Sequence, residues 1–391
     1  MIRNWENVAL GSVCEVVRGG SPRPIIDYIT EEESGVNWLK IGDVRETDKY
    51  FLHAAEKIKP SGIPKTREVI EGDLILSNSM SFGRAFITLI DGYIHDGWLR
   101  LRSDENRLDK EFLYYYLTSD LAQNQFKAIA TGSVVNNLKS DTVKAIRIDL
   151  PTIHEQKAIA SVMARFDDMI KSNEEINENL QAQAFTVFDR LISSSRGELV
   201  PLNTIAELNP KRQIAKGVSA RYIDMSQLST SGAFPSGWEM KPYNGGMRFS
   251  NGDTIMARIT PCLENGKTAF IDFLDSSEVA FGSTEYIVLS SRGVYPSEFF
   301  YWLARYPSFV DYAVANMNGS SGRQRVSAET LSNYYVPLLN KDDLALFAET
   351  VPPLFSCMRN NSLENMRLAS LRDILLPRLM SGELDVSSIE L

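Results

Sequence analysis

Two segments of the chain carry apolar residues at the alternating four- and three-residue spacing of a helix seam. In the first, the seam positions are Ile159, Met163, Phe166, Ile170, Asn173, Asn177, Leu180, Ala184, Val187 and Leu191. In the second, they are Phe347, Val351, Leu354, Met358, Asn361, Asn365, Leu368, Arg372, Leu375 and Leu379. This spacing predicts two long helices, each with one mainly apolar stripe for a partner helix.

Polar residues interrupt both stripes at the same depth. Asn173 and Asn177 lie in the first stripe, and Asn361 and Asn365 occupy the same positions in the second (361 − 173 = 365 − 177 = 188). Buried Asn in such a seam commonly fixes register and partner. We therefore expect the two helices to pair with each other. The alternative is two independent amphipathic helices, each lying on its own domain.

Both helical segments begin with capping residues. Thr152 with Glu155, and Asn340 with Asp343, have the spacing of a helix N-cap and its third helical residue. Pro352-Pro353 then predicts a break in the second segment, because proline inside a helix removes a backbone hydrogen bond. In each half we expect a short helix that closes the module, followed by a long one from about Phe166 or Leu354, of about 28 residues and roughly 40 Å in length.

The sequence outside these helical segments also contains an internal duplication. "EFLYYYL" from Glu111 resembles "EFFYWLA" from Glu298, and "GDLIL" from Gly72 parallels "GDTIM" from Gly252. Segments such as "RAFITLI", "IRIDL", "TAFIDFL" and "EYIVLS" read as short strands. The predicted fold class is α/β, with two tandem mixed modules in a pseudo-twofold repeat. The expected domains are 1–150 and 197–338, with helical spacers at 151–196 and 339–391.

Composition narrows the class of protein. The 391 residues are 43% hydrophobic and 23% charged, which is ordinary for a soluble protein of at least two domains. No apolar run is long enough for a membrane helix, and the N-terminus has no signal-peptide pattern. Three scattered cysteines fit a reduced, cytoplasmic setting. The net charge of −9 leaves room for a local basic face.

Motifs for catalysis are missing from the sequence. It contains neither a phosphate-binding Gly-Lys-Ser/Thr loop nor a Gly-x-Gly-x-x-Gly turn after a strand. "HEQKA" at His154 lacks the second histidine of a zinc site. "NPKR" at Asn209 lacks the aromatic residue that stacks on an extruded base. We therefore expect no catalytic residues, no metal and no cofactor in this chain.

Polar loops with cationic residues recur in both halves. Arginine pairs with guanine, Asn and Gln pair with adenine, and Lys holds phosphates, so these loops predict DNA contact. A solvated surface is the alternative for any single residue. The candidate DNA-binding residues are Arg18, Ser21, Arg23, Ser79, Arg84, Asn136, Asn137, Lys139, Lys211, Arg212, Gln213, Lys216, Arg258, Lys267, Arg323, Gln324 and Arg325.

The chain as a whole resembles the specificity subunits of Type I restriction-modification systems. The most specific match is "TGSVVNNLKSDTVKAIRIDLPTIHEQKAIASVM" over 131–163, followed by "FDDMI" and, near the end, "LPRLMSGEL". In the second copy, Leu339, Asp343 and Leu344 replace Pro151, Glu155 and Gln156, so the match there rests on register.

The resemblance implies two target-recognition domains whose helices pair as an antiparallel coiled coil. Each domain would read one half of a split, asymmetric target in double-stranded DNA, and about 12 base pairs would separate the domain centres. Two copies of a methyltransferase subunit would dock, and restriction subunits that translocate DNA would complete the complex. S-adenosylmethionine, ATP and Mg²⁺ would belong to those partners. The target sequence cannot be read from the chain.

Three alternatives remain open. The chain could be the specificity subunit of a related architecture with its nuclease fused to the methyltransferase. It could be a DNA-modifying enzyme with an unrecognised active site, or a coiled-coil scaffold without DNA contact. The missing motifs weigh against the enzyme, and the two large cation-bearing modules weigh against the scaffold.

Overall fold

The computed structural model describes residues 5–45, 48–78, 83–130, 137–320 and 322–386. The chain forms two compact units. Unit 1 comprises Met1–Asp167 and Ser370–Leu391, and unit 2 comprises Asp168–Ala369. Among the described residues, no helix is long and apolar enough to cross a membrane.

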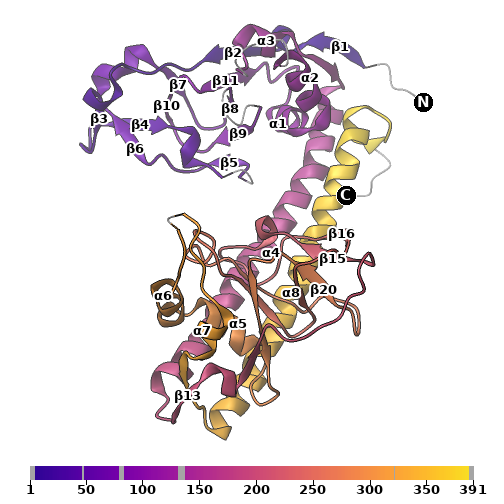
Figure 1. Cartoon of the computed structure of the whole chain (residues 1–391). Coiled ribbons are helices and arrows are strands. Elements are labelled where there is room, and N and C mark those ends of the chain that lie inside the picture. The colour runs from indigo at the N-terminus through magenta and orange to yellow at the C-terminus, as the bar shows by residue number, and fades with distance from the viewer. Residues whose placement is uncertain (1–4, 46–47, 79–82, 131–136, 321, 387–391) are drawn as a thin grey trace. The chain divides into compact units, whose positions relative to one another are not determined.

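Unit 1 is built on two five-stranded sheets and a two-stranded one (Figure 1). The first has the order β2 (Cys14–Arg18), β11 (Trp98–Ser103), β8 (Leu74–Ser77), β9 (Ala85–Thr88), β5 (Tyr50–Phe51). The second has the order β3 (Ile29–Thr30), β6 (Glu56–Ile58), β4 (Val36–Leu39), β10 (Gly92–Ile94), β7 (Arg67–Val69). β1 (Glu6–Ala9) pairs with β12 (Arg147–Leu150). Its helices are α1 (Lys110–Thr118), α2 (Asp120–Ala130) and α3 (Ser140–Ala145).

Unit 2 repeats this topology. One sheet has the order β14 (Ala206–Leu208), β21 (Tyr286–Ser291), β18 (Thr254–Ala257), β19 (Thr268–Phe270). The other has the order β16 (Glu239–Pro242), β15 (Ser219–Ile223), β20 (Ala280–Gly282), β17 (Met247–Phe249). β13 (Leu199–Pro201) pairs with β22 (Tyr335–Pro337). Its helices are α5 (Glu298–Arg305), α6 (Pro307–Ala315) and α7 (Ala328–Ser332).

The sheets of the two units correspond strand by strand. β2-β11-β8-β9 matches β14-β21-β18-β19, and β6-β4-β10-β7 matches β16-β15-β20-β17. Even the single parallel pair of the second sheet recurs, as β4 with β10 and as β15 with β20. Among the described residues, unit 1 adds only β3 and β5 at the sheet edges. The predicted internal repeat and mixed α/β class are confirmed.

Two long helices contribute to the cores of both units. α4 is Ile153–Ser194 and α8 is Lys341–Met380. In unit 1, Ile159 and Met163 of α4 share a core with Leu379 of α8. In unit 2, Phe188 of α4 shares a core with Phe355 of α8. Each module therefore buries its apolar face against a stretch of both helices.

The predicted division into a short and a long helix is wrong in both halves. α4 is continuous, and α8 runs through Pro352 and Pro353. The carbonyl groups that lose their bonding partners belong to Ala348 and Glu349, whose side chains are exposed, so water can reach this side of the helix. On the opposite side, Val351 is fully buried in the core of unit 2. Tertiary burial therefore outweighs the local penalty. The predicted caps at Thr152 and Asn340 are both present.

The seam asparagines pair across the helices in antiparallel register within unit 2. The side-chain amide of Asn173 donates to Oδ1 of Asn365 at 2.9 Å, and that of Asn361 donates to Oδ1 of Asn177 at 2.9 Å. Asn177 also donates to the carbonyl of Met358 at 3.3 Å. Four polar residues in the seam therefore satisfy one another only in this register, as the sequence pattern predicted.

Changing one of these asparagines should destabilise the helix pair. We expect Asn177→Leu to lower the free energy of unfolding by about 1–2 kcal/mol, because the amide of Asn361 loses its partner. The double change with Asn361→Leu should recover much of this, since two apolar residues then face each other. Urea unfolding measures the difference. Asn179→Ala, which removes only a bond within α4, is the control, and equal stability of N177L and N179A would contradict the prediction.

Candidate nucleic-acid interface

Three loops of unit 1 meet at Asn78, directly after β8. The backbone N–H of Asn78 donates to the carbonyl of Gly97 at 2.9 Å, and the N–H of Leu138 donates to the carbonyl of Asn78 at 2.9 Å. Its side-chain amide donates to the carbonyl of Asp96 at 2.8 Å. We call Asn78, Asp96–Gly97 and Asn137–Lys139 junction 1.

Three candidate residues converge on Asp96 in this junction. Ser21 Oγ donates to Oδ1 of Asp96 at 2.7 Å, and Arg23 donates to Oδ2 at 3.1 Å. Arg18 donates through Nε to the backbone carbonyl of Asp96 at 3.1 Å. The hydrogen bond from Ser21 is the largest cause of the lowered pKa of Asp96, so the carboxylate stays ionised. The loop after β2 is thereby held against junction 1.

Unit 2 contains the same junction at the same place in its fold. The N–H of Arg258, directly after β18, donates to the carbonyl of Glu285 at 3.0 Å. The N–H of Val326 donates to the carbonyl of Arg258 at 3.0 Å. Arg258 therefore corresponds to Asn78, Glu285 to Gly97 and Val326 to Leu138. We call Arg258, Glu285 and Arg323–Val326 junction 2.

Two candidate arginines share one carboxylate in junction 2. Arg325 donates from Nε and its terminal nitrogen to Glu285 at 2.8–3.0 Å, and Arg258 donates from Nε to Glu285 Oε2 at 3.2 Å. The hydrogen bond from Arg325 is the first cause of the lowered pKa of Glu285. Arg323 and Gln324 are exposed beside them. The junction thus presents several donors around one fixed anion.

The remaining candidate DNA-binding residues include both exposed and half-buried side chains. Asn137 and Lys139 are exposed in unit 1, as are Lys211, Gln213 and Lys216 in unit 2. Arg84 is half-buried, and Lys267 donates to the carbonyl of Met225 at 2.8 Å. Ser79 and Asn136 lie outside the described residues.

Arg212 has a structural partner. It donates to both oxygens of Asp253 at 2.6 and 2.8 Å, and this carboxylate is fully buried. Asp253 also accepts the N–H of Ser250 at 2.8 Å. In unit 1, Asp73 makes the matching bidentate pair with Arg102, at 2.7 and 2.8 Å. Arg212 is thereby committed to the turn before β18.

Several residues of these sites were missed by the sequence reasoning. Asp96 and Glu285 hold the candidate arginines, yet only cationic, amide and hydroxyl side chains were sought and no carboxylates. Asn78 was passed over beside the candidate Ser79. The repeated Gly-Asp pairs at 72–73 and 252–253 were a usable signal for the two buried aspartates. Nothing comparable in the sequence marked Asp96 or Glu285, because the residues around them come from distant segments.

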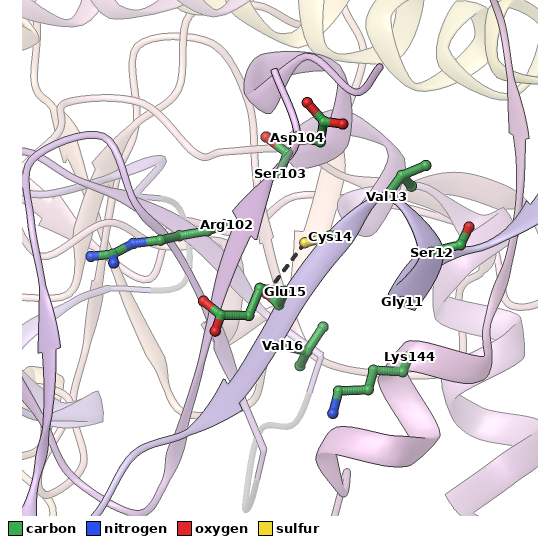
Figure 2. A pocket seen from close by; sticks show the side chains of 10 residues that line it. All are labelled: Gly11, Ser12, Val13, Cys14, Glu15, Val16, Arg102, Ser103, Asp104 and Lys144. Atoms are coloured by element: carbon green, nitrogen blue, oxygen red, sulfur yellow. Dashed lines mark hydrogen bonds between the residues drawn. The ribbon is translucent and has the colours of Figure 1, made fainter. Parts of the chain in front are cut away.

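A shallow depression elsewhere on unit 1 does not have the features of a catalytic site (Figure 2). It is lined by Gly11–Val16, Arg102–Asp104 and Lys144. Burial raises the pKa of the Cys14 thiol to about 12, so this cysteine is not a thiolate nucleophile. Arg102 is committed to Asp73. Within the described ranges, no group of three or more His, Cys, Asp or Glu residues could hold a metal ion.

Comparison with known proteins finds matches to one family. Residues 2–182 match the Type I restriction modification DNA specificity domain. The chain is similar to the HindI specificity subunit of Haemophilus influenzae, with 23% identity over 97% of this chain and 100% of the relative. It is also similar to the MjaIX specificity subunit of Methanocaldococcus jannaschii, with 21% identity over 99% of this chain and 95% of the relative.

The fold is likewise found in a solved structure. The Type I restriction-modification S subunit from M. genitalium superposes with a TM-score of 0.58 and 17% identity, covering 96% of each chain. The likeness in fold extends over nearly the whole chain, as do the sequence matches. Residues 2–182 therefore match the Type I restriction modification DNA specificity domain, and the chain over nearly its whole length is similar to specificity subunits of Type I restriction enzymes.

Proposed function

We propose that the chain recognises a bipartite, asymmetric target in double-stranded DNA, with each unit reading one half through its junction. The observation that carries this proposal is that the junction recurs at equivalent positions with different side chains. Asn78 and Gly97 in unit 1 stand where unit 2 has Arg258 and Glu285. Two junctions with one backbone geometry and different exposed donors beside it would recognise two different sequences.

The exposed donors support this role. Arg18 and Arg23 flank junction 1, and Arg323 and Gln324 belong to junction 2. Such side chains reach base edges or phosphates in the grooves of DNA. Lys211, Gln213 and Lys216 would contribute further phosphate contacts in unit 2. Two candidates are left out of the proposed interface. Arg212 makes a bidentate pair with the fully buried carboxylate of Asp253, and the half-buried Lys267 donates to the carbonyl of Met225.

The helix pair would serve as the platform for partner subunits. Two copies of a methyltransferase subunit would bind the repeated helices, and restriction subunits with translocase activity would join the full complex. S-adenosylmethionine, ATP and Mg²⁺ would bind to those partners. The continuous α4 and α8 support a second role, in which the helices set the number of unread base pairs between the two half-targets.

Selection from a random duplex DNA library tests the recognition proposal. We expect the full-length chain to enrich two short motifs separated by a fixed gap, with an affinity that falls steeply as salt rises. Incubation with S-adenosylmethionine, ATP and Mg²⁺ should give neither methylation nor cleavage by the chain alone. One continuous motif, no motif at all, or measurable turnover would contradict the proposal.

A further inference from the structure

In the arginine–carboxylate cluster of junction 2, the guanidinium of Arg258 is hydrogen-bonded through Nε alone among the described residues. Arg258 is held at Nε by Glu285, and among the described residues its two terminal nitrogens have no partner. Its side chain is 32% exposed. Arg325, by contrast, gives Nε and one terminal nitrogen to Glu285 and the other to the carbonyl of Arg323. One arginine of the pair is therefore largely committed, and the other is fixed in place with its outer end free.

We infer that Arg258 reads a guanine in the half-target of unit 2, and that Glu285 is the positioning residue that orients its guanidinium. This rests on the proposed DNA recognition. A guanidinium recognises guanine through two parallel N–H groups, which its free terminal nitrogens supply. Holding Nε beforehand reduces the side-chain entropy that binding would otherwise remove.

The other contacts of Glu285 fit a positioning role. Its carboxylate is 23% exposed and accepts from Arg325 on both oxygens, so it cannot rotate freely. Arg325 in turn ties the carboxylate to the exposed loop that carries Arg323 and Gln324. A hydrogen bond from Arg325 also keeps the pKa of Glu285 low, so its charge persists at neutral pH. Glu285 thus connects the start of β21 to the loop that carries Arg323 and Gln324.

Variants at both positions separate this role from a merely structural one. Arg258→Lys keeps the charge and loses the planar pair of donors. In library selection by the full-length chain, it should lower the preference for guanine at one position of one half-target by roughly 10-fold or more. Binding to a duplex without the motif should stay unchanged. Glu285→Gln should reduce preference at the same position, while the removal of a negative charge strengthens binding to the motif-free duplex.

The matched control is Glu278→Gln in the same unit. Glu278 accepts from Arg221 at 2.6 Å, and its side chain is 22% exposed, close to that of Glu285. Its substitution makes the same change in charge and should leave every base preference as in the wild type. Thermal unfolding of each variant checks that unit 2 remains folded.

Three results overturn the inference. They are unchanged base preferences in R258K and E285Q, changes in both half-targets, and a loss of specific and motif-free binding in parallel with a fall in thermal stability. If the wild-type chain itself enriched no bipartite motif, the proposed function would fail instead, so the two failures are distinguishable.

Discussion

Replacing residues 1–150 with the first module of another specificity subunit should change one half of the recognised DNA sequence and leave the other half intact. All described strands of unit 1 lie within this range, as do α1, α2, α3 and junction 1. The exchange point falls between β12 and α4, where Thr152 caps the long helix. Library selection with the chimaera measures both halves in one experiment.

The reciprocal exchange of residues 197–338 is the control, and it should change only the other half. The core of unit 1 also includes Ile159 and Met163 of α4 and Leu379 of α8. A donor module with apolar residues that fit these positions is therefore required, and thermal unfolding verifies that it has docked. If either exchange altered both half-targets, the two units could not be independent readers.

Asp253→Ala should produce the largest loss of stability from a single substitution discussed for this chain. The carboxylate is fully buried and accepts from Nε and one terminal nitrogen of Arg212 and from the N–H of Ser250. Its removal leaves a guanidinium that is only 24% exposed without its partner. Breaking a buried ion pair in this way costs about 3 kcal/mol or more. Urea unfolding should show the loss in unit 2.

Asp275→Ala provides the comparison for this variant. Asp275 also accepts from an arginine, Arg221, at 3.2 Å, but its side chain is 84% exposed. Because solvent screens such a pair, its loss should cost no more than about 1 kcal/mol. Hydrogen exchange localises the effect, since amides of β18 and β21 should lose protection in D253A while those of unit 1 keep theirs. Equal stability of the two variants would contradict the prediction.

Much of the fold could be predicted because its determinants are local or periodic. The heptad spacing and the matched asparagines predicted the helix pair, and Asn173 with Asn365 and Asn177 with Asn361 form the interhelical bonds. The duplicated segments predicted two similar α/β modules. The functional domain limits and the individual DNA contacts stay predictions, since they depend on the bound complex.

The path of α8 through Pro352-Pro353 was decided by tertiary packing. A local rule predicted a break, because each proline removes one backbone hydrogen bond. The burial of Val351 and Phe355 in the core of unit 2 overrides that rule.

The side-chain contacts between each module and the long helices could also be identified only from the structure. In unit 1, Tyr115 donates to Asp167 at 2.6 Å, and Arg372 donates to the same carboxylate at 2.9 Å. At the equivalent place in unit 2, Trp302 packs against Phe355 with ring centroids 6.1 Å apart. The contact in unit 1 is polar and includes an ion pair, whereas the contact in unit 2 is apolar. Both lie at the same position along the repeated helices.

The sequence by itself thus determined the repeat, the helices and their register, because these follow from spacing along one segment. Only the tertiary structure decided which cations are free to reach a ligand. Arg212 and Arg258 are similar loop arginines in sequence, yet one is tied to buried Asp253 and the other only at Nε to Glu285. The partners come from distant strands, and the electrostatic role of an arginine depends on the carboxylate that the fold places beside it.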